Sequence, residues 1–220
     1  TPKPPFIEHD HFEETQAVID LIAPDGSSET ISLSGPTQVD VFFDGVTEGS
    51  ADDDDNNGLE EVDTEIVLLN LTGSSSLGPV SVRLNPDIPS RGMMEETANN
   101  TTGLLDLPPF TSTGTADSFF DVFFEVEING LILRTLKPKR MSGIINHKPP
   151  DFGDFYENLE DIELFTPEGR PSGFFIGAGR HTPKPPFIEH DHFEETQAQI
   201  DLIDPNGNSE TISLSGPTQV

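Results

Sequence analysis

The stretch Phe119–Leu136, FFDVFFEVEINGLILRTL, alternates large apolar residues with acidic ones and then turns. An alternation of period two predicts a β-strand with one apolar face. The apolar positions of that face are Phe120, Val122, Phe124, Val126 and Ile128. Asn129-Gly130 between two apolar runs is the strongest short signal for a hairpin. We therefore predict a strand over 119–128 that pairs with a second strand over 131–136.

The same alternation recurs on both sides of this hairpin, with turn residues between the runs. Further strands are expected at 17–22, 30–34, 39–43, 65–71, 80–84, 162–165 and 174–176. Helical periodicity is nearly absent, apart from a short helix expected at 93–97 within a polar connection. About ten short strands with turns between them predict an all-β fold, namely an antiparallel β-sandwich that is Ig-like in general architecture.

The beginning of the chain recurs at its end. Thr1–Val39 and Thr182–Val220 differ at only four of 39 positions, and three of the four lie in a turn. We therefore expect residues 1–181 to be one full repeat unit and 182–220 to be the start of the next, in a window cut from a longer tandem array. The Pro-rich segment 182–186 is interpreted as a spacer between units. In a variant of this interpretation, residues 182–220 complete the sheet of the preceding unit by strand exchange.

The charge is strongly one-sided, with 40 acidic residues against 11 Lys and Arg and a net charge of −29. Such a chain repels nucleic acids and anionic membranes, so neither is expected as a partner. There is no cysteine and therefore no disulfide framework. Motifs for nucleophilic catalysis, phosphate loops or zinc proteases are absent, so the sequence predicts that the protein is not an enzyme.

An acidic loop offers the sharpest candidate site. Asp53, Asp55, Asn57 and the following glycine fit D-x-[DN]-x-[DN]-G, the front half of a calcium loop. Thr64 stands where a bidentate glutamate is expected, and Glu61 or Asp63 can substitute for it. We predict a Ca²⁺ site here, and the alternative is a solvated acidic loop.

Two histidine pairs form a second candidate metal site. His9 and His11 alternate in an extended segment, and His190 and His192 repeat them in the second copy. Side chains two residues apart in a strand point the same way, so each pair can chelate a transition metal if a third ligand joins it. The alternative is that they are simply exposed polar residues.

Five of the eleven basic residues lie close together in this acidic chain. They are Arg134, Lys137, Lys139, Arg140 and Lys148. One interpretation is an electrostatic contact with the acidic face of a neighbouring unit. The alternatives are an internal counter-charge for the loop at 52–55, or chance clustering.

Several segments resemble an uncharacterised family of large exported bacterial proteins. They are Asp55–Val62 (DNNGLEEV), Asn70–Gly73 (NLTG), Leu77–Val80 (LGPV) and Ser118–Glu125 (SFFDVFFE). Members of that family carry acidic calcium-type loops and repeated β-domains. The resemblance implies export and repetition, and it implies no catalytic residue, because no activity is known for the family.

Together these observations predict an extracellular or cell-surface protein. Its function would be that of a structural or adhesive fibre, built from tandem β-sandwich repeats and stabilised by Ca²⁺. The expected partners are neighbouring copies of the same repeat, which strand exchange could join, and a cell-surface or glycan target. The alternative function is a secreted carbohydrate- or surface-binding module.

Overall fold

The computed structural model describes residues 6–45, 47–184, 187–203 and 209–219. These residues form fourteen strands in one sheet, and every strand pair is antiparallel. The described part contains no helix long and apolar enough to cross a membrane. The expected all-β, antiparallel character is thus confirmed.

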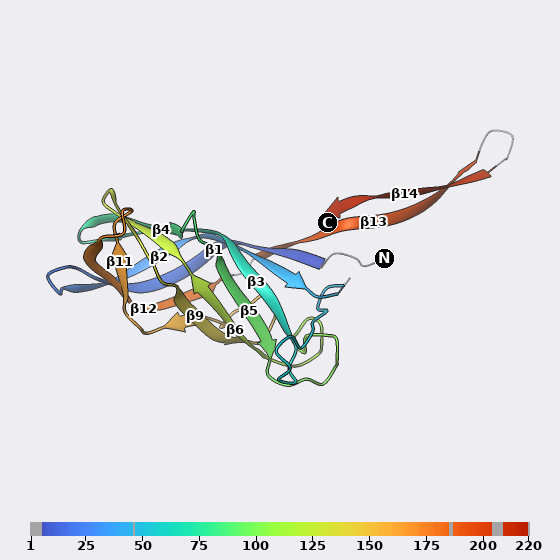
Figure 1. Ribbon diagram of the computed structural model, residues 1–220, viewed down its shortest axis with the longest axis horizontal. Helices are drawn as coiled ribbons and strands as arrows, with labels where there is room; N and C mark the ends of the chain where they lie inside the picture. Colours follow the sequence, from blue (N-terminus) through green and yellow to red (C-terminus); the bar gives the residue numbers. More distant parts are fainter. Residues whose placement is uncertain (1–5, 46, 185–186, 204–208, 220) are drawn as a thin grey trace.

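Four long strands make up one wall of the molecule (Figure 1). They are β1 (Phe6–Ile22), β2 (Ser28–Phe43), β3 (Glu61–Ser75) and β12 (Pro171–Pro183). β2 lies between β1 and β3, while β12 pairs with the other edge of β1. The first and last strands of the main body therefore meet, which leaves no free edge at this seam.

The opposite wall is built from shorter strands in two tiers. One tier contains β5 (Ser90–Glu96), β6 (Ala116–Val122), β9 (Lys139–Ile145) and β10 (Tyr156–Asn158). The other contains β4 (Gly78–Leu84), β7 (Phe124–Ile128), β8 (Leu131–Arg134) and β11 (Ile162–Phe165). β3 pairs with β5 through one half and with β4 through the other, and β12 likewise pairs with β10 and β11. Each tier therefore completes a closed ring of strands.

The chain follows this barrel in simple up-and-down order. The barrel has eight strand positions around its circumference. Four of them are occupied by the long strands, and each of the other four is occupied by two short strands in line, one from each tier. This differs from the predicted sandwich, which would have two separate sheets. The alternation of apolar and polar residues fixes which face of a strand is buried, but not whether the edges of the sheet meet.

The stretch at 119–128 is broken where it passes from one tier to the other. The Ser90 hydroxyl accepts the Phe123 N–H at 2.9 Å and donates to the Phe123 carbonyl at 3.2 Å, and this carbonyl also accepts the Asn85 N–H at 2.9 Å. The break keeps the alternation, so the five predicted inward residues are all buried. The hairpin at Asn129-Gly130 is confirmed, with positive φ at both residues. The short helix expected at 93–97 is wrong, because most of this segment belongs to β5.

Two loops close one end of the barrel. The loop at 97–115 buries Leu105 and Leu107 completely. Its Phe110 packs edge-on against Phe43, with ring centroids 5.5 Å apart. The loop at 44–60 lies beside it, and the Leu105 N–H donates to the Gly49 carbonyl at 2.8 Å. We call this pair of loops the cap.

The second copy of the repeat forms a hairpin that projects from the barrel (Figure 1). Its strands are β13 (Phe187–Ile203) and β14 (Ser209–Gln219), and β13 pairs with β1 only along Ile7–Phe12. The spacer expected at 182–186 overlaps the end of β12, and residues 185–186 lie outside the described part. The division into units at residue 181 and the strand exchange stay predictions.

Candidate ligand-binding cavity

The barrel encloses a cavity of about 120 Å³. Most of its wall is made of inward-facing apolar side chains, which include Leu33, Val41, Ile66, Leu69, Val82 and Phe120. These residues alternate with outward-facing ones along their strands, as the barrel requires. A cavity of roughly 150 Å³ with such a lining stays dry and can take up benzene. The present cavity thus has room for a small apolar molecule, or for part of a longer one.

A buried charge cluster stands at one side of this cavity. Glu8 and Asp10 are alternate inward residues of β1, and Lys148 follows β9. The Lys148 ammonium donates to the Glu8 carboxylate and, at 2.7 Å, to Asp10 Oδ1. Both Asp10 and Lys148 line the cavity. Because an isolated buried charge is costly, the cluster depends on mutual pairing, and loss of one partner would leave the others uncompensated.

Tyr156 adds a neutral polar group to the same wall. Its hydroxyl donates to Ser118 Oγ at 3.1 Å. Burial raises the pKa of the Tyr156 phenol, and the nearby carboxylates of Asp154 and Asp10 act in the same direction. Tyr156 therefore remains protonated at any physiological pH, and it presents a ring and a hydroxyl rather than a charge.

Two polar atoms of the cavity wall have no hydrogen-bond partner within the described part of the chain. They are the Thr64 hydroxyl, on an inward position of β3, and Nε2 of His181 on β12. Burial lowers the pKa of His181 to about 4, so its imidazole is neutral at pH 7. Buried polar atoms are nearly always hydrogen-bonded, which makes these two the best indication of where a ligand's polar group would sit.

The sequence indicates Lys148 only as a member of the basic cluster, and it does not indicate Thr64, Tyr156 or His181 as cavity residues. Thr64 stands out in it only as a departure from the calcium-loop pattern. Its position two residues before Ile66 in an alternating strand could have shown that it faces inward. No spacing pattern could have indicated Tyr156 or His181, because they face the cavity only once the barrel has closed.

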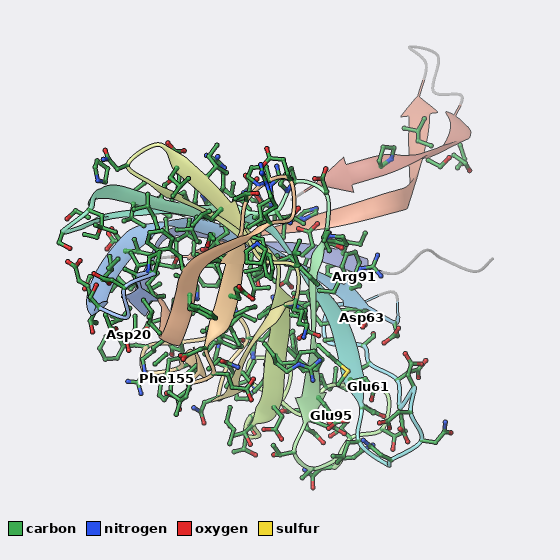
Figure 2. The ribbon with its side chains drawn as sticks, turned by 60° about the vertical axis from the view of Figure 1, so that its left-hand side comes forward. Asp20, Glu61, Asp63, Arg91, Glu95 and Phe155 are labelled. Atoms are coloured by element: carbon green, nitrogen blue, oxygen red, sulfur yellow. The ribbon has the colours of Figure 1, made fainter. Side chains whose placement is uncertain are left out.

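The acidic loop brings together three of its five predicted ligands. One carboxylate oxygen each from Asp53, Asp55 and Glu61 lies within 4.8 Å of the others. Asn57 turns its side-chain oxygen to the Leu59 N–H, at 2.7 Å, and donates to Glu95. Asp63 is an exposed residue of β3, two positions beyond Glu61 (Figure 2). Asp63 is not one of the three carboxylates, whereas Asn57 adjoins them: its backbone N–H donates to Asp53 and Asp55, and its side-chain amide donates to Asp55.

The histidines fall on the seam between the two copies. His9 and His190 lie opposite each other in the β1–β13 ladder, and His9 Nδ1 is 2.6 Å from Asp40 Oδ1. His11 lies opposite Ile188, and His192 lies opposite Ile7. The side chain of His192 lies outside the described part, and those of His9, His11 and His190 do not form a group of three potential ligands with other described residues. A transition-metal site here stays a prediction.

Most of the clustered basic residues have partners within the barrel. Arg134 donates to Glu125 and Asp87, and Arg140 forms a paired contact with Asp121. Lys139 donates to Asn158 and to the Glu160 carbonyl, and burial lowers its pKa. Lys148 belongs to the buried cluster described above, while Lys137 is exposed. A contact of this segment with a neighbouring unit stays a prediction.

Neither a known protein family nor a curated protein sequence matches the chain. Its fold is similar to a solved structure, that of DynF from the dynemicin biosynthesis pathway of Micromonospora chersina. The similarity has a TM-score of 0.58 and covers 84% of each chain, at 20% sequence identity. At this level of identity the comparison establishes the shared fold.

The comparison corrects two expectations from the sequence. The structural or adhesive fibre is wrong, because the chain shares its fold with a protein of a biosynthetic pathway. The comparison does not bear on the carbohydrate- or surface-binding alternative, which stays a prediction. The prediction that the protein is not an enzyme is overturned by the same finding. A sequence motif detects residues at fixed spacing along the chain, whereas the residues of this cavity come from strands that are far apart in the sequence. The sequence therefore contains no sign of the cavity.

Proposed function

We propose that this protein binds an uncharged, mostly apolar small molecule inside the barrel. The observation that carries the proposal is an apolar cavity whose wall contains two buried polar atoms, Thr64 Oγ1 and His181 Nε2, that have no hydrogen-bond partner among the described residues. Eight-stranded barrels are wide enough to hold one small ligand. The fold similarity to a protein of a biosynthetic pathway also supports a role that involves small molecules.

The charges of the wall decide which ligands fit. Lys148 is already paired with Glu8 and Asp10, while Tyr156 and His181 are both neutral at pH 7. A charged ligand group would lose its hydration in a cavity whose lining is almost wholly apolar, and an anion would also lie near the two carboxylates that share Lys148. A hydroxyl or carbonyl group, in contrast, can bond to Thr64 or His181 at little cost.

Two matched probes test this proposal, 4-fluorotoluene and 4-fluorobenzyl alcohol, observed by ¹⁹F NMR. Both should bind, and the alcohol should bind about three- to tenfold more tightly because its hydroxyl gains a hydrogen bond. Thr64→Val should reduce this preference if Thr64 is the partner, and His181→Phe should reduce it if His181 is. The proposal is contradicted if the wild-type protein binds neither probe at millimolar concentration. It is also contradicted if the wild-type protein and both variants bind the two probes equally well.

Filling the cavity provides a second test with a matched control. Ala17 lines the cavity, whereas its neighbour Val18 is exposed on the outer face. Ala17→Leu should abolish binding of both probes, while Val18→Leu should leave it unchanged. Circular dichroism of both variants checks that the barrel is retained. Equal binding by both variants would place the probes outside the barrel.

A catalytic use of the cavity is the second candidate function, and His181 favours it. Its imidazole is neutral at pH 7, and Nε2 has no partner among the described residues, so the tautomer with its proton on Nδ1 can accept a proton from a bound molecule at Nε2. The probe 5-nitrobenzisoxazole tests this capacity: the base takes its C3 proton while the N–O bond breaks, which yields a coloured cyanonitrophenolate. We expect turnover above the rate of imidazole in buffer, and its loss in His181→Gln. Turnover no faster than that of imidazole in buffer would remove this candidate.

A further inference from the structure

Glu61 is the residue of the acidic loop that calls for an explanation. Its side chain is only 6% exposed, and its Oε2 atom has no hydrogen-bond partner within the described residues. Its other oxygen, Oε1, accepts the Asp54 N–H at 3.0 Å. A carboxylate oxygen buried without a partner is costly, and a bound cation is one of the few groups that offset this cost.

The surroundings of Glu61 favour a cation over any other partner. The carboxylates of Asp53 and Asp55 lie within 4.8 Å of that of Glu61, and no basic side chain is among the hydrogen-bond partners found for these three. Three carboxylates in one place repel one another unless a multivalent cation joins them.

We propose that Asp53, Asp55 and Glu61 form a Ca²⁺-binding site. All three offer hard oxygen ligands, and Ca²⁺ accepts such ligands at roughly 2.3–2.6 Å in flexible geometry. Oxygens within 4.8 Å of one another can therefore share one Ca²⁺ ion. Mg²⁺ requires stricter octahedral geometry and gives up its water reluctantly, so a cluster of three protein carboxylates suits Ca²⁺ better. Water or backbone carbonyls would supply the remaining ligands.

Glu60, the residue just before β3, couples the site to the loop at 97–115. Glu61 faces the acidic loop, while Glu60 accepts the N–H groups of Gly103 and Leu104 at 2.5 and 2.9 Å. Those two residues directly precede the completely buried Leu105. An ion bound to Glu61 would therefore hold the start of β3 and, through Glu60, the loop at 97–115. Ca²⁺ is thus expected to stiffen the closed end of the barrel.

Calorimetric titration of chelator-treated protein with CaCl₂ tests the site directly. We expect one ion per chain with a Kd on the order of 10⁻⁴ M, typical of extracellular calcium modules. Glu61→Gln should weaken binding at least about tenfold, because it removes a charged ligand. Asp52→Asn is the matched control: it removes one charge from the same loop at an exposed residue outside the group of three, and it should change Kd by less than about threefold.

A second measurement follows the coupling to the cap. Hydrogen exchange of the Gly103, Leu104 and Leu105 amides should slow on addition of Ca²⁺ in the wild-type protein and in Asp52→Asn, but not in Glu61→Gln. The proposal is overturned if the wild-type protein takes up no Ca²⁺ at millimolar concentration. It is also overturned if Asp52→Asn weakens binding as much as Glu61→Gln does, or if Mg²⁺ binds as tightly as Ca²⁺. Either result would indicate general charge screening instead of a built site.

Discussion

The hairpins β1–β2 and β13–β14 have nearly the same sequence and very different surroundings. Their ladders match residue for residue: Thr15 lies opposite Gly35, and Thr196 lies opposite Gly216, with a register shift just before each pair. Yet Leu33 is 3% exposed in the barrel, while the equivalent Leu214 is 50% exposed. Strand register is thus set within the hairpin, whereas burial depends on which other strands close around it.

Leucine truncation should separate the two hairpins most strongly. Leu33→Ala removes buried methyl groups and should lower the free energy of unfolding by about 2–5 kcal/mol. Leu214→Ala should change it by less than about 0.5 kcal/mol, because the side chain is exposed. Urea unfolding followed by circular dichroism measures both. Equal losses would mean that the second hairpin also packs against a core.

The bulge glycines offer a second contrast. Gly35 has φ of +154°, and a Cβ atom there would stand 2.1 Å from the Asn70 carbonyl oxygen of β3. Around Gly216, no atom of the described structure lies within 4 Å of such a Cβ. Gly35→Ala should therefore cost about 1–3 kcal/mol, because backbone must shift. Gly216→Ala should cost much less, and urea unfolding again gives the comparison. A neutral Gly35→Ala would show that β2 and β3 are not this close in solution.

The same contrast explains how far the sequence could predict the molecule. Local features could be predicted: the inward positions at the end of β1, from Ala17 to Leu21, the Asn129-Gly130 turn and the carboxylates of Asp53, Asp55 and Glu61 all follow from alternation or short motifs. The closure of the barrel could not be predicted from the sequence. It depends on the pairing of β12 with β1, whose paired residues are more than 150 positions apart in the chain, and no local pattern encodes that pairing. The cavity and its polar atoms depend on that closure, and so they were missed.

Acid should weaken the barrel seam before it affects the projecting hairpin. Burial lowers the pKa of His181 from 6.5 to about 4. Between these pH values, His181 is protonated in the unfolded state but stays neutral in the folded state. Stability should therefore fall as the pH drops from 6.5 to 4, by about 1–2 kcal/mol once the partial exposure of the ring is allowed for.

The difference between wild-type and His181→Gln unfolding curves across this pH range isolates the contribution of His181 from that of the carboxylates. The wild-type protein should lose stability relative to the variant as the pH falls. Amide exchange should show the loss at the β1–β12 pairs around His181 and Ala17, and not at β13–β14. Parallel curves for the two proteins would show that His181 is solvated in the folded state.

The smallest effect is expected where the two copies already differ on an exposed face. Val18 is 44% exposed, and the second copy has Gln199 in its place. Val18→Gln should change the free energy of unfolding by less than about 0.5 kcal/mol, since it buries no polar group. Ala17→Gln is the matched control one residue away, and it should cost several times more because it places an amide in the apolar cavity. If the two substitutions cost the same, the inner and outer faces of β1 are not distinguished in solution, and the hairpin in the barrel would be no better packed than its copy outside.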